Sequence, residues 1–260
     1  MLQARLTSSR STALSAAGAA AFLGLWSAAA LSGMTSRDFL PAPWDVATRF
    51  AHLVAEPFAG YTLLQHLLSS FQRFATGFVL AVLVGIPLGL LMAWFRWIDR
   101  IVSPAFDAVR FVAPIAWVPF AGLWFGTGIG GPTLIIFSGA FPPCLINAYR
   151  GAKYVDRRLV EAARTLGASG PRVVLEVLLP ASLPSIVAGL RVAAGIGWQS
   201  LVGAELIVVA SGVGYMMVQA QLSVVTPIVM AGMVAIGLVG VVIDAVLRGA
   251  EERIKRSWGR

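Results

Sequence analysis

The stretch FATGFVLAVLVGIPLGLLMAWF, residues 74–95, contains no charged side chain. A helix needs about 20 consecutive apolar residues to cross the hydrocarbon core of a bilayer, and this stretch has that length. Gly85 and Gly89 lie four residues apart on it, a spacing that lets two membrane helices approach each other closely. We therefore predict a membrane-spanning helix over 74–95 that packs tightly against a neighbour.

Five other apolar stretches predict further spans by the same criterion of length. Glycines and a proline between 126 and 132 divide the long uncharged run over 111–149 into two of them. The composition agrees, because apolar residues make up 58% of the chain and charged residues only 12%, against roughly 25% charged residues in soluble domains. No charged or Ser/Pro-rich linker separates the stretches, so we expect residues 1–260 to form one all-α integral membrane domain of about six transmembrane helices. The five stretches are 12–31, 111–126, 132–149, 185–209 and 228–243.

Positive charge is distributed unevenly over the predicted loops. Sixteen Lys and Arg residues precede span one, connect spans two and three, connect spans four and five, or follow span six, whereas three connect spans one and two. Because cytoplasmic loops carry the excess of Lys and Arg, we predict a multi-pass protein of the bacterial cytoplasmic (inner) membrane with both termini in the cytoplasm. The net charge of +8 then reflects these loops and contact with anionic membrane lipid, and indicates no binding of nucleic acid.

The first span has a second interpretation. A short basic start, an apolar run and the small residues at 28–30 also fit a cleaved secretory signal peptide, although the run is longer than the usual apolar region of such peptides. The other five spans keep their orientation in either case.

The segment between spans one and two predicts an amphipathic helix at the membrane interface, because apolar residues recur at helical spacing after two prolines. His52 and His66 also lie there, without cysteines or clustered carboxylates at metal-ligand spacing, so we expect packing or surface histidines and no metal site. The recurring apolar residues are Trp44, Ala47, Phe50, Ala51 and Val54.

The cytoplasmic stretch between spans four and five, residues 153–184, predicts two short helices. Asp156 is a favourable N-cap for a helix over 157–166, which Gly167 can close. A second short helix is expected from Arg172 to Leu178, just before Pro180. Such a pair of helices, held at both ends by membrane spans, is a rigid projection from the membrane.

Three anchor points in this stretch carry a family resemblance. Glu161-Ala162-Ala163, then Gly167, then the run over 177–180 resembles the "EAA" loop of ABC-importer permeases, in which coupling helices dock into a groove on the ATP-binding subunit. The alternative is an ordinary amphipathic hairpin whose arginines only follow the positive-inside rule. The resemblance implies a set of ATPase-coupling residues: Glu161, Ala162, Ala163, Gly167, Leu179 and Pro180.

Three further segments, residues 113–126, 183–198 and 211–215, resemble the permeases for taurine, aliphatic sulfonates, nitrate and bicarbonate. This branch implies the type I ABC-importer permease fold and a homodimer with a second copy of the chain. It also implies two separate ATP-binding subunits and an extracytoplasmic solute-binding protein. A sulfonate such as taurine is the expected solute, with nitrate, bicarbonate and pyrimidine precursors as alternatives.

The sequence contains no Gly-x-x-x-x-Gly-Lys-[Ser/Thr] phosphate-binding loop. We therefore expect this chain not to be an enzyme and to hold no cofactor, with ATP and Mg bound by the partner ATPase subunit. A channel or secondary transporter is the rival class, disfavoured because the intramembrane charges are too few for a proton relay and no inverted repeat is evident. A structural membrane scaffold is a third class, disfavoured by the broken apolar run and the coupling-type loop.

Two charged residues, Arg191 and Glu205, lie within the fifth predicted span. Intramembrane charges often mark a translocation pathway, but an arginine can also tie helices together. Both interpretations stay open for Arg191, and for Glu205 we expect a structural or gating role. Trp117 and Trp198 join them as pathway residues, with packing or an interfacial position as the alternative.

Overall fold

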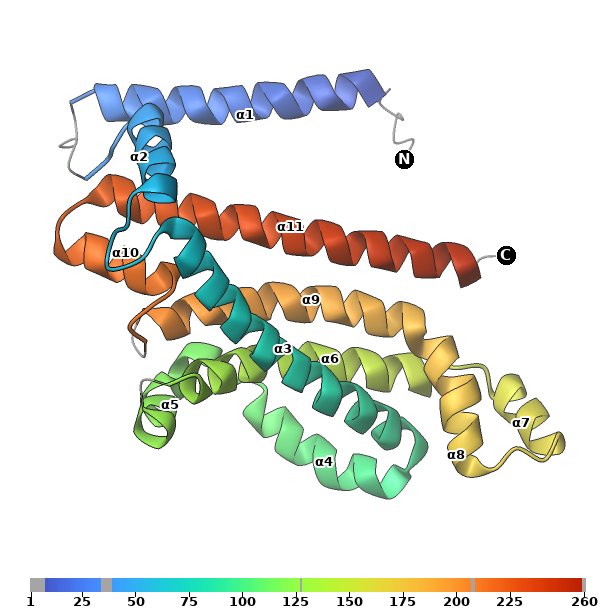
Figure 1. The fold of residues 1–260 in the computed structure, drawn as a ribbon. Helices are drawn as coiled ribbons and strands as arrows, with labels where there is room; N and C mark the ends of the chain where they lie inside the picture. The colour runs from blue at the N-terminus through green and yellow to red at the C-terminus, as the bar shows by residue number, and fades with distance from the viewer. Residues whose placement is uncertain (1–7, 34–38, 127, 207–208, 259–260) are drawn as a thin grey trace. The chain divides into compact units, whose positions relative to one another are not determined.

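The computed structural model describes residues 8–33, 39–126, 128–206 and 209–258. All regular elements within these ranges are helical, and Figure 1 labels the longer ones. In chain order they are α1 (Ser8–Leu31), α2 (Pro43–Ala55), α3 (Leu63–Trp94), α4 (Arg96–Val109), the 3₁₀ turn η1 (Pro114–Trp117), α5 (Val118–Phe125), α6 (Gly130–Lys153), α7 (Arg157–Thr165), α8 (Gly170–Val173), the π turn η2 (Val174–Leu178), α9 (Leu179–Glu205), α10 (Val213–Leu222) and α11 (Thr226–Trp258).

The chain forms two compact units, which are described separately. The smaller unit comprises residues 1–63 and 216–234. In it, the indole Nε1 of Trp26 on α1 donates a hydrogen bond to the carbonyl oxygen of Pro41 at 3.1 Å. Helix α1 is otherwise open on nearly all sides, which suits a helix whose neighbours are lipid chains.

Helix α2 confirms the predicted amphipathic helix. Val46 and Leu53 are its buried residues. Trp44 and Val54, on the face predicted to lie in the membrane interface, are more than half exposed. The exposed apolar face therefore agrees with a helix that lies on the bilayer surface.

The larger unit comprises residues 64–215 and 235–260. Its core lies where α3, α6 and α9 pack together through small side chains, among them Ala81, Ala140 and Ala193. A β-carbon at Gly89 would lie only 2.6 Å from the carbonyl oxygen of Leu145. The close approach predicted from the Gly85 and Gly89 pair is therefore confirmed, with α6 as the partner helix.

Five helices in the described ranges are long and apolar enough to span a membrane, and a bent pair makes up to six. The predicted third span, 111–126, needs correction, because it is no continuous helix. Instead, α4 and the stretch Pro114–Phe125 form a pair bent by 88°. Pro114 disfavours helical geometry at the preceding residue, and Ala113 is extended with ψ of 139°. Helix α4 was not predicted from the sequence, because charged residues interrupt its apolar pattern.

The other predicted spans coincide with helices that have different ends. Helices α3, α6 and α11 extend past the uncharged stretches 74–95, 132–149 and 228–243, because polar residues continue a helix beyond the apolar core. The fifth predicted span, 185–209, corresponds to α9, which ends at Glu205, and residues 207 and 208 lie outside the described ranges.

The expected separate helix Arg172–Leu178 also needs correction. Helical structure runs without interruption from Gly170 to Glu205. It passes through the π turn η2, where the amide of Leu179 donates to the carbonyl of Val174. The wider turn lets Pro180, which has no amide hydrogen, enter the first turn of α9 without ending the helix. Figure 1 shows the ribbon changing direction between α8 and α9.

Candidate coupling loop and pathway residues

Helix α7 begins at the predicted N-cap. The carboxylate of Asp156 accepts a hydrogen bond from the amide of Arg158 at 2.9 Å. Asp156 therefore satisfies one of the amide groups that a helix start leaves without a partner.

Helix α7 ends in a Schellman motif centred on Gly167. The amide of Gly167 donates to the carbonyl of Arg164 at 2.9 Å, and the amide of Ala168 donates to the carbonyl of Ala163 at 3.0 Å. Gly167 has φ of +81°, a left-handed conformation that glycine adopts without steric cost. The chain reverses here and enters α8.

The loop around Gly167 contacts the end of α3, and residues on its far side are buried. The guanidinium of Arg164 lies 5.3 Å from the ring centre of Trp94, the last residue of α3. Val173 is fully buried, and Leu178 is 4% exposed. Buried side chains and the contact with Trp94 therefore hold this loop against its neighbours. The rigidity of the loop stays a prediction.

The six predicted coupling residues fall into two groups. Glu161, Ala162 and Gly167 are exposed, and Ala163 is half-buried. Leu179 packs against the buried cluster of α3, α6 and α9 that contains Leu90, Ala148 and Ile186, and Pro180 follows in the first turn of α9. The first group lies on a surface open to a partner, and the second anchors that surface to the membrane helix. Sequence reasoning missed Leu159 on α7 and Leu166 at its C-cap, which are 52% and 88% exposed.

Arg191 of α9 is bound to carboxylates of α11. Its Nε and Nη2 donate to Asp244 at 2.5 and 3.1 Å, and Nη1 lies 3.5 Å from Glu251. Asp244 also lies 3.6 Å from Arg248. These contacts favour the architectural interpretation of Arg191 over a direct role in the pathway. Sequence reasoning missed both carboxylates, because they are far from Arg191 along the chain.

Glu205, at the other end of α9, is buried within a cluster of hydrogen-bond donors. Its side chain is 1% exposed and forms an ion pair with Arg73 of α3 at 2.9 Å. The hydroxyl of Ser70 donates to both carboxylate oxygens at 2.7 and 2.8 Å, and the amide of Gly214 donates at 3.0 Å. Arg73 was expected in an extracytoplasmic loop, but the structure places it within α3.

The segment after α9 closes over this carboxylate. Arg73 donates to the backbone oxygen and the hydroxyl of Ser211, and the amide of Val213 donates to Ser70 at 3.0 Å. A β-carbon at Gly212, where φ is +108°, would collide with the carboxylate of Glu205. The amide of Gly212 donates to Nδ1 of the buried His66, which confirms His66 as a packing histidine. The cluster therefore ties the end of α9 to α3, and we call it the Glu205 cluster.

The two predicted tryptophans are both packed. Trp198 is 5% exposed, donates from Nε1 to the carbonyl of Ile236 at 3.1 Å, and packs edge-on against Phe74. Trp117 is half-buried and lines an apolar cavity of about 430 Å³ between α4 and α6. The hydrogen bond to Ile236 and the contact with Phe74 make packing the better interpretation of Trp198.

Comparison with known proteins decides the family. Residues 85–258 match the family described as "Binding-protein-dependent transport system inner membrane component". The chain belongs to this family. The family resemblance seen in the loop and in the three branch segments is thereby confirmed, and the protein is a transport permease subunit of the inner membrane and not itself an enzyme.

Several curated relatives are similar to this permease over most of its length. A putative ABC transporter permease protein of Methanocaldococcus jannaschii is 41% identical over 207 residues, which are 78% of each chain. The taurine transport system permease protein of Escherichia coli is 35% identical, over 95% of this chain and 90% of that one. The bicarbonate transport system permease protein of Synechococcus elongatus is 32% identical, over 93% and 88%.

The fold is shared with a solved transporter. A chain of the MetNI methionine ABC transporter in inward-facing conformations matches with a TM-score of 0.58 at 18% identity, over 72% of this chain and 95% of that chain. The predicted all-α permease fold of the ABC importers is therefore confirmed.

Proposed function

We propose that this permease translocates a small solute with an oxyanion head, and that a sulfonate such as taurine is the first choice. The relative that transports taurine and the branch segments over 113–126 and 183–198 support this choice. The relative that transports bicarbonate supports the alternative of a smaller oxyanion. The pyrimidine-precursor importers of the same type are the third candidate.

The proposed assembly contains two copies of this chain, two ATP-binding subunits and an extracytoplasmic solute-binding protein. The observation that carries it is α7, an exposed helix with defined ends on a rigid support. Its exposed Leu166 and Leu159 offer apolar area to a partner groove. The arginines around α7 and at the end of α11 fit a cytoplasmic location for this surface and for both termini.

In the proposed mechanism, ATP binding closes the ATPase subunits and draws the two α7 surfaces together. The continuous helical path from Gly170 into α9 carries this movement into the membrane. The Glu205 cluster holds the far end of α9 to α3, so the movement reaches the extracytoplasmic side. Hydrolysis then returns the permease to its inward-facing state.

The test is a pair of substitutions at Gly167. Gly167→Val places a β-branched side chain in a left-handed conformation, at a cost of about 1 to 2 kcal/mol, while no atom lies within 4 Å of the added β-carbon. The added side chain therefore meets no neighbour, and the strain acts on the backbone at residue 167. A change of backbone conformation there tilts α7, the docking surface. Gly167→Asn is the matched control, because asparagine tolerates this conformation.

Membranes with each variant are assayed in parallel for permease amount, co-purified ATPase subunit and taurine uptake. We expect all variants at normal abundance, with ATPase binding or coupled uptake lost in Gly167→Val and retained in Gly167→Asn. Normal uptake by Gly167→Val would show that this loop is not the coupling element. If the unaltered permease transports solute without any co-purified ATPase subunit, the channel or secondary transporter is favoured instead.

A further inference from the structure

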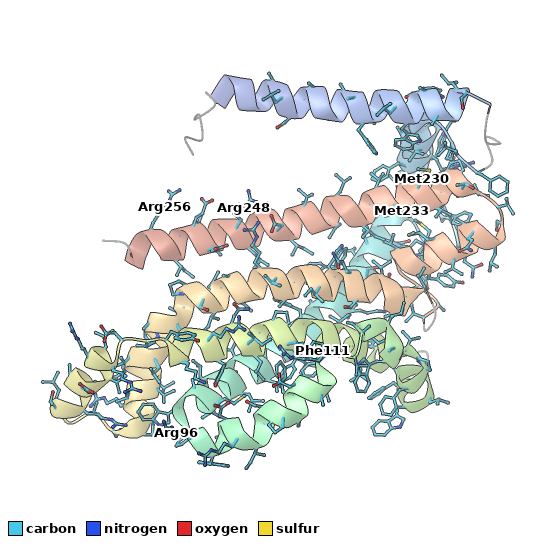
Figure 2. All side chains as sticks on the ribbon, turned by 180° about the vertical axis from the view of Figure 1, so that it is seen from behind. Arg96, Phe111, Met230, Met233, Arg248 and Arg256 are labelled. Atoms are coloured by element: carbon cyan, nitrogen blue, oxygen red, sulfur yellow. The ribbon has the colours of Figure 1, made fainter. Side chains whose placement is uncertain are left out.

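The break between α4 and α5 forms one wall of a cavity. Arg110, Phe111 and Pro114 belong to this break and line a cavity of about 380 Å³. Figure 2 labels Phe111 where the chain leaves α4, close to α6. Irregular backbone at membrane depth is tolerated only where protein covers it or where it lines a wet cavity. The break lines such a cavity here, and this is the observation from which the inference starts.

The opposite wall is formed by α6, and its backbone is unusually polar. Pro142 and Pro143 have no amide hydrogen, so the carbonyls of Ser138 and Gly139, four residues earlier, lose their usual intrahelical donors. All four residues line the cavity, together with Asn147, whose Nδ2 donates to the carbonyl of Pro143 at 2.9 Å. Polar groups thus face a cavity whose remaining wall is apolar, a combination that is usual for small-molecule sites.

Arg110 supplies the positive charge of this cavity. In the described part of the chain its guanidinium has one ion pair, from Nε to Asp107 at 2.9 Å, and both side chains reach solvent. Asp107 does not line the cavity. Arg73 and Arg191, by contrast, are bound to buried or multiple carboxylates. The planar guanidinium, with several donors in fixed directions, suits an oxyanion that accepts two hydrogen bonds at once.

We propose that this cavity is a solute-contact site of the permease and that Arg110 holds the oxyanion head of the solute. The short apolar part of the solute then rests on Phe111 of the break and Ile196 of α9. Ligand cavities span about 300 to 1,000 Å³, so this cavity suits a small solute rather than an oligomer. The inference deepens the proposed function and rests on it for the class of solute.

The first test measures taurine uptake by the complete transporter in proteoliposomes, with ATPase and solute-binding subunits present. Arg110→Gln should lower uptake about tenfold or more, the factor expected for loss of a hydrogen bond to a charged group. The amount of assembled complex should stay unchanged. Asp107→Asn is the matched control, since it removes the same ion pair but leaves the guanidinium, and it should keep or raise uptake. Equal loss in both variants, or normal uptake by Arg110→Gln, would overturn the proposal.

A second measurement needs neither ATPase nor transport. Ser138→Cys places a thiol in the cavity wall, while the native Cys144 is buried. The purified permease is treated with an anionic sulfonatoethyl or a cationic trimethylammonioethyl methanethiosulfonate. Arg110 should favour the anionic reagent, and Arg110→Gln should abolish this preference. A preference that does not depend on Arg110 refutes the site. If the preference is present but taurine and bicarbonate are not transported, the proposed function fails and the anion site stands.

Discussion

The Glu205 cluster allows a prediction whose size can be worked out from its contacts. The carboxylate of Glu205 accepts hydrogen bonds from three donors: Ser70, Arg73 and the amide of Gly214. A carboxylate offers only acceptors, whereas glutamine replaces one oxygen with an NH₂ donor. Glu205→Gln therefore brings two donors face to face and leaves Arg73, whose side chain is 12% exposed, without its counter-charge.

Breaking a buried ion pair by removing one partner costs about 3 to 5 kcal/mol. We expect about 3 kcal/mol for Glu205→Gln, because glutamine keeps the shape and one acceptor. In a unit of this size each kcal/mol lowers the midpoint of thermal unfolding by about 2 to 4 °C. The expected decrease is therefore about 6 to 12 °C, measured on the purified permease in detergent.

The matched control is Glu176→Gln. Glu176 also pairs with an arginine, Arg172, at 3.0 Å, but both side chains are more than 60% exposed. Such an exposed pair contributes about 0 to 1 kcal/mol, so this variant should unfold near the wild-type midpoint.

A double-mutant cycle completes the test. The double variant Arg73→Gln with Glu205→Gln removes both charges, and it should recover part of the lost stability with a coupling energy of about 1 to 3 kcal/mol. If the two single effects simply add, Arg73 and Glu205 do not stabilise each other and the cluster does not hold α9 to α3.

Two further predictions concern helix packing. Gly89→Leu should reduce the amount of folded permease in the membrane, because its β-carbon would meet the α6 backbone, at a cost of about 3 kcal/mol. Gly195→Leu, in open space, is the control, and equal amounts of both variants would contradict the packing. Arg191→Gln should lower the yield of intact complex, since it leaves Asp244 and Glu251 without their shared cation, and Asp244→Asn should restore part of it. Normal assembly with selectively slower taurine uptake would instead assign Arg191 to the pathway.

The sequence predicted the features whose causes are local. The ends of α7 follow from Asp156 and Gly167, whose preferences depend on the backbone immediately beside them. Long uncharged stretches located the continuous spans, because the bilayer imposes a length on each of them. The coupling role of this loop follows from the family resemblance, not from a local rule, and stays a prediction.

Features that depend on tertiary packing were not predictable in the same way. The partners of Arg191 and Glu205 lie on other helices, so only the fold brings them within bonding distance. A signal existed for Glu205, because Arg73 borders the second span on the same predicted side of the membrane. Helix α4 was missed because Asp99, Asp107 and two arginines, Arg96 and Arg100, make it too polar to be recognised as a span.

Because of the π turn η2, the number of residues between α7 and α9 affects how the two helices are oriented relative to each other. Each residue of an α-helix advances the direction of the next side chain by about 100°. A π turn accommodates one residue more than the regular helix, without a gap in the hydrogen bonding. Deletion of that residue would leave every side chain of α7 unchanged. It would rotate α7 by about a quarter turn or more relative to α9. The number of residues in η2 therefore sets the direction in which α7 faces relative to α9, whatever the identity of those residues.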